Sequence, residues 1–278
     1  MGAKRILKLF LISAKLDLMW FLRDTKFALT AMAADVISNL SAVSGMLLIA
    51  VRFGGIGGMS TDEILFMMAY STLVTGLFIV FGSGNNFHIS RIIGRGQLEH
   101  LFIQPLSLPK QLLTSGFMPF TGGGNLIIGI IMTGVAVQRM QMRISIGWVL
   151  ALLGSVIVTL AIIVARSYLV ASITFYAPVA AEEISTTAIE ETWFLSTFPL
   201  SGMPKFIQIP LLTFLPEGLM AWFPAMCLLG KPPFYLGEYY PLFFALLLAL
   251  TAGHFFKRGM RYYIQKGANR YVPYGFRR

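Results

Sequence analysis

The sequence IGWVLALLGSVIVTLAIIVARSYLVASITF, residues 146–175, determines the class of fold, and its only charged side chain is Arg166. An apolar run of about 18 or more residues indicates a membrane-spanning helix, because a hydrocarbon core of ~30 Å takes about 20 residues at a rise of ~1.5 Å each. Lipid offers no hydrogen-bond partners to an open strand, so this segment should be a helix that satisfies its own backbone.

Five further apolar stretches share this character: residues 27–51, 64–82, 112–137, 206–229 and 241–256. The composition agrees with them, since 56% of the residues are hydrophobic and only 12% are charged, whereas a soluble domain has about 25% charged residues. The sequence therefore predicts an all-α membrane protein with six transmembrane helices within residues 27–256.

The net charge of +10 is concentrated at the two ends of the chain. Six cations precede the first apolar stretch and seven follow the last one, out of 22 in total. Cytoplasmic flanks of membrane helices carry such an excess of Lys and Arg. We therefore expect both termini in the cytoplasm and an even number of crossings. Contact with anionic lipid explains the basic tail at 257–278 better than binding to nucleic acid.

Residues 1–26 are predicted to form an amphipathic helix ahead of the first span. On a helical wheel its apolar side chains gather on one side and its cations on another: Leu7, Phe10, Leu11, Ala14, Leu18, Phe21 and Leu22 against Arg5, Lys8, Lys15, Arg23 and Lys26. This pattern is typical of a helix lying in the membrane interface. The alternative is an amphipathic helix that packs on a partner protein.

Asp35 and Asn39 stand out because they lie inside the first span. A carboxylate at mid-membrane costs roughly 2.5–3.5 kcal/mol, so Asp35 should not face lipid. Ser38, Ala42 and Gly45 share its helix face. The face is either a structural hydrogen-bond cluster between helices or the polar lining of a pathway.

Glycines mark the span at 112–137, which contains Gly122, Gly123, Gly124, Gly129 and Gly134. Glycine lets neighbouring helices approach closely. Pro119, near the beginning of this span, predicts a kink.

Catalytic motifs are missing from the sequence. The glycines at 54–58 lack the phosphate-binding GxxxxGK[ST] pattern, and Ser60 with Glu63 instead predicts a helix capping box. Cys227 is the single cysteine, and the three histidines lie on different segments without the spacing of metal ligands. We expect no catalytic residues and no metal site on this chain.

The loop at 83–111 contains a candidate short helix from Gly96 to Leu106, ended by Pro105. Leu98, Leu101 and Phe102 lie on one side of it. An exposed apolar patch on a cytoplasmic loop usually marks a protein partner. The alternative is a helix folded back on the membrane interface.

The sequence of residues 176–229 is compatible with two membrane topologies. Pro210, Pro216 and Pro224 break the apolar run at 206–229. Either this run is the fifth crossing, or a polar helix near 180–198 crosses and 204–228 forms a re-entrant hairpin. Irregular backbone at membrane depth is tolerated only where protein or a cavity surrounds it.

Three segments resemble a family of transport proteins. GQLEHLFIQPL, from Gly96 to Leu106, resembles the pattern G-E-L-D-x-L-L-x-R-P-L of six-span permeases of type-2 ABC exporters, with Glu99 in place of Asp and Gln104 in place of Arg. The segments FPL at 198–200 and PEGLMAWFPAMCLLGK at 216–231 resemble two further patterns of that family.

The resemblance implies that the loop helix is a coupling helix that docks on an ATPase dimer, which binds ATP and Mg²⁺ in place of this chain. The coupling residues would be Gly96, Leu98, Glu99, Leu101, Phe102, Pro105 and Leu106. It also favours the crossing at 180–198 and the hairpin at 204–228. Glu190 and Glu191 would then lie, like Asp35 and Asn39, near the pathway or a permease dimer interface. The second permease would be a different chain or a second copy.

The predicted function is therefore a permease subunit that forms half of an export pathway in the bacterial inner membrane. A secondary transporter would need coupling carboxylates in several spans and an inverted repeat, but Asp35 is the one clear mid-span acid. An intramembrane enzyme would need paired acids or a nucleophile at useful spacing, and the sequence has neither. A membrane assembly protein without transport activity is the third rival hypothesis.

Overall fold

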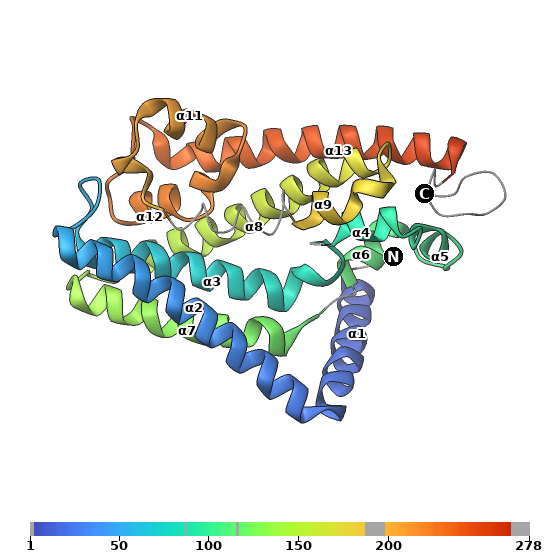
Figure 1. The fold of residues 1–278 in the computed structure, drawn as a ribbon, viewed down its shortest axis with the longest axis horizontal. Helices are drawn as coiled ribbons and strands as arrows, with labels where there is room; N and C mark the ends of the chain where they lie inside the picture. Colours follow the sequence, from blue (N-terminus) through green and yellow to red (C-terminus); the bar gives the residue numbers. More distant parts are fainter. Residues whose placement is uncertain (1–2, 87, 115–116, 187–197, 268–278) are drawn as a thin grey trace.

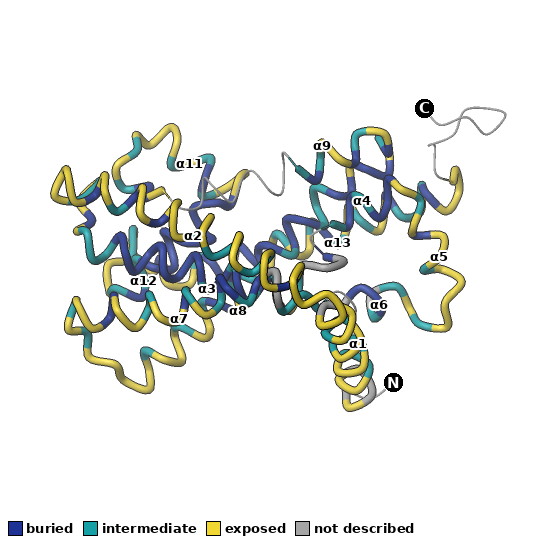
Figure 2. Tube along the Cα trace, turned by 60° about the horizontal axis from the view of Figure 1, so that its bottom comes forward, coloured by how far each residue is buried: buried dark blue, intermediate teal, exposed yellow. Residues whose placement is uncertain are grey.

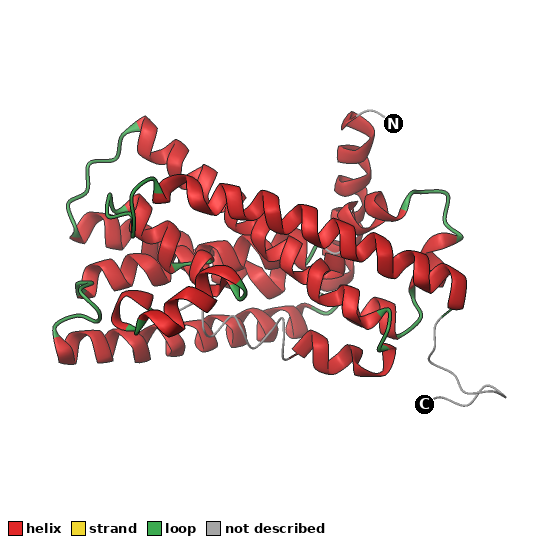
Figure 3. Cartoon of the chain, turned by 90° about the horizontal axis from the view of Figure 1, so that it is seen from above, coloured by secondary structure: helices red, strands yellow, loops and turns green. Residues whose placement is uncertain are grey.

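The computed structural model describes residues 3–86, 88–114, 117–186 and 198–267, and every regular element in these ranges is helical (Figure 3). The long helices are α1 (Ala3–Arg23), α2 (Thr25–Phe53), α3 (Thr61–Asn86), α7 (Pro119–Arg139), α8 (Ile146–Thr174) and α13 (Tyr240–Lys266). The short ones are α4 (Ile89–Gly94), α5 (Leu98–Phe102), α6 (Leu108–Thr114), α9 (Ala181–Ser185), α11 (Lys205–Thr213) and α12 (Trp222–Leu228), with 3₁₀ turns η1 (Pro178–Ala180), η3 (Leu200–Gly202), η4 (Pro216–Leu219) and η5 (Gly237–Tyr239).

Four described segments are long and apolar enough to cross a membrane: Thr25–Phe53, Thr61–Gly82, Ile146–Thr174 and Gly237–Lys266. The predicted stretch at 146–175 coincides with α8 to within one residue. The count becomes five if Lys205–Thr213 and Pro216–Leu228, which are bent by 72°, are taken as one span. The chain is thus an all-helical membrane protein.

The span predicted at 112–137 is interrupted in the structure rather than kinked. α6 ends at Thr114 and α7 begins at Pro119. Pro119 does not kink a helix, because it occupies the beginning of α7, where the missing N–H has no partner to lose. α13 differs in the other direction, since it continues ten residues past 256, to Lys266, into the predicted basic tail. Cations near a helix C-terminus interact favourably with the helix dipole.

The long helices form a bundle with α3 at its centre (Figure 1). α3 packs extensively on α7, and α8 packs on α13. In Figure 2 the tube of α3 is largely buried, whereas α1 is largely exposed. α1 runs across the bundle at the end that holds α4, α5 and α6. We name this the elbow end, and residues 88–114 the elbow.

Glycines bring α3 and α7 into close contact, as the sequence predicted. A Cβ atom added to Gly129 would lie 2.5 Å from the Cα of Leu73, and one added to Gly76 would lie 2.4 Å from the backbone N of Leu126. Gly122 faces Ile79 in the same way, because a Cβ atom added to Gly122 would lie 2.7 Å from the Ile79 Cβ. These contacts are close helix approaches that no larger residue permits.

Replacing Gly129 with alanine should therefore destabilise the bundle by about 1–3 kcal/mol, the usual cost of overpacking. Gly134→Ala is the matched control on the same helix, because no atom of a neighbouring element lies within 4 Å of its added Cβ. In the Gly134→Ala control, the higher helix propensity of alanine should stabilise the folded protein by about 0.5–1 kcal/mol. Thermal unfolding in detergent measures both variants, and equal stability of the two would contradict the tight contact.

The opposite end of the bundle is held by polar and backbone contacts around the α2–α3 loop. The predicted capping box is confirmed: the Ser60 N–H donates to Glu63 Oε2 at 2.9 Å, and the Glu63 N–H donates to Ser60 Oγ at 3.3 Å. Glu63 also pairs with the Lys231 ammonium at 2.5 Å. Gly57 packs on Gly202, since a Cβ on Gly57 would lie 2.1 Å from the Gly202 backbone N.

These contacts place residues 202 and 231 at the same end, so the hairpin at 204–228 leaves and returns there. We name this the hairpin end. Pro210 lies inside α11, and Pro216 begins η4. Only Pro216 stands at the bend between α11 and η4, whereas Pro210 and Pro224 are accommodated inside α11 and α12.

Candidate functional site

The elbow joins α3 to α7 and packs against the ends of two other long helices. A cluster of buried side chains holds it: Ile89, Ile92, Ile93, Leu98 and Leu112 from the elbow, Ala171 from α8, Phe175 just after it, and Tyr263 from α13. Gly94 lies so close to η1 and α9 that a Cβ on it would fall 2.1 Å from the Ala181 Cβ. The elbow is therefore a packed unit rather than a free loop.

Its short helix, α5, is shorter than predicted. Gly96 has φ +70°, a left-handed conformation outside the helical region, so the helix begins only at Leu98. It ends at Phe102, and Pro105 follows in an exposed position. The Gln111 amide donates to two open carbonyls, Leu101 O at 2.8 Å and Leu106 O at 2.6 Å. Gln111 stabilises the turn after α5, and sequence analysis missed it because an internal glutamine gives no local signal.

The predicted coupling residues separate into an inner and an outer set. Leu98 is 0% exposed and packs inside the elbow, and Leu101 packs partly buried against the same cluster. Glu99 accepts a hydrogen bond from the Tyr263 hydroxyl at 3.3 Å. Phe102 is 43% exposed, although its ring lies 6.4 Å from the Tyr263 ring. The neighbouring Ile103, which was not among the predicted coupling residues, is 82% exposed. Leu98 therefore anchors α5 to the protein and does not contribute to its outward surface.

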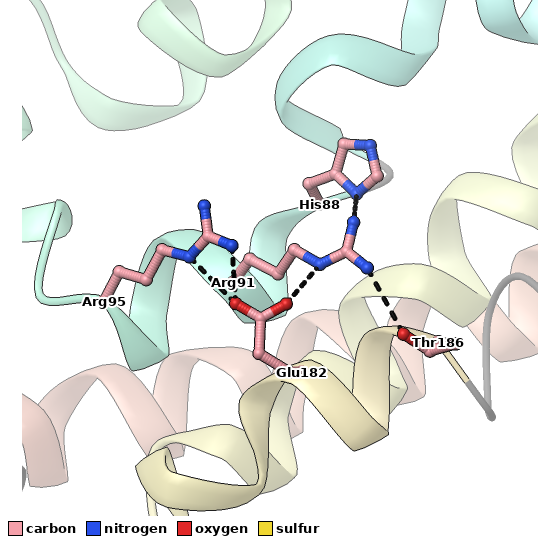
Figure 4. Close-up of polar contacts among 5 residues, drawn as sticks. All are labelled: His88, Arg91, Arg95, Glu182 and Thr186. Carbon is pink, nitrogen blue, oxygen red and sulfur yellow. Dashed lines mark hydrogen bonds and ion pairs between the residues drawn. The ribbon is translucent and has the colours of Figure 1, made fainter.

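Two ion pairs, Arg91–Glu182 and Arg95–Glu182, connect the elbow to α9, and we name them the latch (Figure 4). Glu182 lies between two guanidinium groups, with Arg91 Nε donating to Oε2 at 2.7 Å and Arg95 Nε donating to Oε1 at 2.8 Å. Arg91 also bonds His88 Nδ1 at 2.9 Å and the Thr186 hydroxyl at 3.3 Å. One carboxylate of α9 thus holds two guanidinium groups of the elbow.

Removing the charge of Glu182 should weaken the latch. Because Glu182 is half exposed, its ion pairs contribute about 1 kcal/mol at most. Glu182→Gln at neutral pH should raise local opening of α4 and α9 roughly fivefold, measured by amide hydrogen exchange. Glu183→Gln, at the exposed neighbouring position, should change nothing.

Asp35 and Asn39 both line a cavity of about 170 Å³ between α2, α3 and α7. The Thr72 hydroxyl of α3 donates to Asn39 Oδ1 at 3.3 Å, which is an interhelical hydrogen bond. Asn125 of α7 also lines the cavity, and sequence analysis did not connect it to Asp35. Glu190 and Glu191 lie outside the described residues.

An unpredicted ion pair fixes the hairpin to α8. Arg166 Nη2 lies 2.7 Å from Glu217 Oε1, and the Glu217 side chain is 0% exposed. Each partner was visible in the sequence as a lone charge in an apolar stretch. Their separation along the chain hides the pairing, and only the fold of the hairpin brings them together.

Within the described ranges, no three His, Cys, Asp or Glu side chains cluster closely enough to hold a metal ion.

Comparisons with curated proteins and with solved structures found no match for the chain. Residues 37–267 match the family described as ABC-2 family transporter protein, and the match includes the elbow, most of the cavity and the hairpin. The chain therefore belongs to the ABC-2 family of transporter proteins.

Proposed function

We propose that this chain is the permease subunit of an ATP-driven exporter and forms half of its translocation pathway. The ATPase dimer that binds ATP and Mg²⁺ is a separate chain, and the elbow is the coupling element that docks on it. A second permease, either a different chain or a second copy, completes the pathway.

One observation carries this proposal: the elbow presents an exposed apolar tip on a rigidly held base. Phe102 and Ile103 are exposed, while Leu98 and the latch at Glu182 bind the base of the elbow to α8, α9 and α13. A short helix transmits force only if it packs tightly on both sides. Because the base of the elbow is packed against these helices, a movement of the docked tip would move the long helices with it.

For the membrane topology we propose six crossings: α2, α3, α7, α8, the segment at 180–198 and α13. Much of 180–198 lies outside the described residues, but its flanks support the assignment. Glu182 is bound at the elbow end, and Gly202 packs at the hairpin end. The hairpin is then re-entrant, α1 lies in the interface, and the basic termini and the elbow share the cytoplasmic side of the bacterial inner membrane.

The test is purification of the tagged permease from its native membrane in mild detergent. We expect a nucleotide-hydrolysing subunit to co-purify in fixed proportion, with ATPase activity that the permease stimulates. Impermeant thiol labelling of single cysteines in the two tails, in a Cys227→Ser background, should modify both tails only after the cells are opened. A complex without any ATPase, or labelling of one tail in intact cells, would refute the proposal.

A further inference from the structure

The cavity that contains Asp35 is built from three helices and opens beside Ser38 and Ala42, which are exposed on α2. α2 contributes Asp35, Ser38, Asn39, Ala42 and Val43, α3 contributes Met68, Ser71, Thr72 and Thr75, and α7 contributes Asn125. Asp35 is the eleventh residue of α2, about 15 Å from the start of that helix at a rise of ~1.5 Å per residue. The cavity is therefore well inside the span and away from both ends of α2.

Two buried oxygens in this cavity have no hydrogen-bond partner within the described ranges: Asp35 Oδ2 and Asn125 Oδ1. The Asn125 side chain is only 8% exposed, so solvent around the protein does not compensate for the missing bond. A buried polar atom left without a partner destabilises the folded protein, and more strongly when it is charged. Such a cost at two oxygens of one cavity indicates that the cavity is shaped for a ligand that both can bind.

Two neighbouring side chains are already committed to bonds within the protein. Asn39 Oδ1 already accepts from Thr72, and the Thr75 hydroxyl donates its proton to the Ser71 carbonyl at 2.8 Å. The Thr75 oxygen then retains only lone pairs for the cavity. The amides of Asn39 and Asn125 and the serine hydroxyls also carry donors, but the one charged group in the cavity is the Asp35 carboxylate, which repels an anion and attracts a cation.

The charged residues around the cavity indicate how many positive charges a bound cation should carry. Asp35 is the one charged residue that lines the cavity. The other charged residues of α2, α3 and α7 lie within two positions of a helix end: Lys26, Arg52, Asp62, Glu63 and Arg139. One carboxylate is neutralised by a single positive charge, and a divalent ion would leave an excess charge in the membrane.

We propose that this cavity binds one singly charged cation, held by the Asp35 carboxylate and Asn125 Oδ1 with help from the neighbouring hydroxyls. Carboxylate, amide and hydroxyl oxygens are the ligands of hard cations such as alkali metal ions. A protonated ammonium group uses the same acceptors through its N–H bonds. A free ion and the ammonium group of a transported molecule are the two sources of this chemistry. The site requires no ATPase and does not depend on the proposed coupling.

The experiment uses the purified permease alone, at fixed pH and ionic strength, with N-methylglucamine replaced stepwise by sodium, potassium or methylammonium. Binding to the folded state raises Tm as the cation saturates the site. We expect a saturable rise of at least about 3 °C with one of the three cations, since 1 kcal/mol shifts Tm by about 2–4 °C in a chain of this size class. A response to an alkali ion alone identifies a free ion, and a response to methylammonium alone identifies a cargo ammonium group.

Asp35→Asn should abolish the rise in Tm, because it keeps the shape of the side chain and removes the charge. Asn125→Ala should weaken the affinity at least tenfold. Asp62→Asn is the matched control, since Asp62 pairs with Arg139 at 2.9 Å outside the cavity, and it should retain the full cation response. A Tm that depends on pH but on none of the three cations would show that Asp35 is simply protonated, and would overturn the proposal. So would an equal cation response in Asp35→Asn.

Discussion

In the proposed complex, replacing Ile103 with aspartate should raise the permease concentration needed to stimulate the ATPase roughly 30-fold and leave the permease folded in the membrane. Ile103 is 82% exposed, so the substitution removes almost no packing inside the chain, and surface changes of this kind usually alter stability by less than about 0.5 kcal/mol. At the docked interface the same change removes an apolar anchor and buries a carboxylate. Losing such an anchor costs about 2 kcal/mol or more, which lowers the apparent affinity roughly 30-fold.

The measurement is ATP hydrolysis by the purified ATPase, titrated with permease in lipid nanodiscs. Ile144→Asp is the matched control, because Ile144 is 62% exposed but lies in the turn before α8, away from the elbow. Leu101→Asp is a poorer test, since Leu101 packs against the buried elbow cluster and its loss would also loosen the elbow. Full stimulation by the Ile103→Asp protein at the same concentrations as the unaltered permease would remove the elbow tip from the ATPase interface.

Replacing Glu217 with alanine should produce the largest loss of stability in the chain, about 3–5 kcal/mol. The Glu217 carboxylate is fully buried 2.7 Å from Arg166, which is 9% exposed. Removing the carboxylate leaves the Arg166 guanidinium buried without its counter-charge, and the hairpin loses its ionic attachment to α8. Tm should fall by about 10 °C, measured by thermal unfolding in detergent.

A second variant separates the pairing from the packing. Arg166→Met combined with Glu217→Leu replaces both charges by apolar side chains, and such exchanges of buried pairs are often neutral or stabilising. The double variant should therefore recover most of the stability that Glu217→Ala loses. A double-mutant cycle gives the coupling energy directly. Additive losses in the cycle would mean that the two charges do not depend on each other.

Hydropathy predicted the helices well wherever it alone determines them. The apolar run at 146–175 became α8, and the run at 27–51 lies within α2. It did not locate the break between α6, which ends at Thr114, and α7, which begins at Pro119, because apolar residues flank the break on both sides. Hydropathy did not decide whether the segment at 204–228 crosses the membrane or turns back as a hairpin. Prolines show where a helix can break but not in which direction the chain continues.

The elbow shows the limit of a helical wheel. Leu98, Leu101 and Phe102 were correctly recognised as the apolar residues of α5, but the wheel does not reveal which of them face the rest of the protein. Leu98 packs against α8 and α13, and Phe102 remains exposed. Sequence analysis missed the roles of Gln111, Asn125 and the Arg166–Glu217 pair for a related reason. Those roles depend on contacts with other elements, which no local pattern records.

The contact of Gly57 with Gly202 has a practical consequence for reporter insertions. Gly57 has φ +59° and lies against backbone atoms of the hairpin end, so the short α2–α3 turn has no room for an added epitope. A tag inserted there would push the hairpin away from the bundle. The turn between α7 and α8 is the better site, because Gln141, Arg143 and Ile144 are all exposed, and exposed loop tips tolerate inserted sequence best.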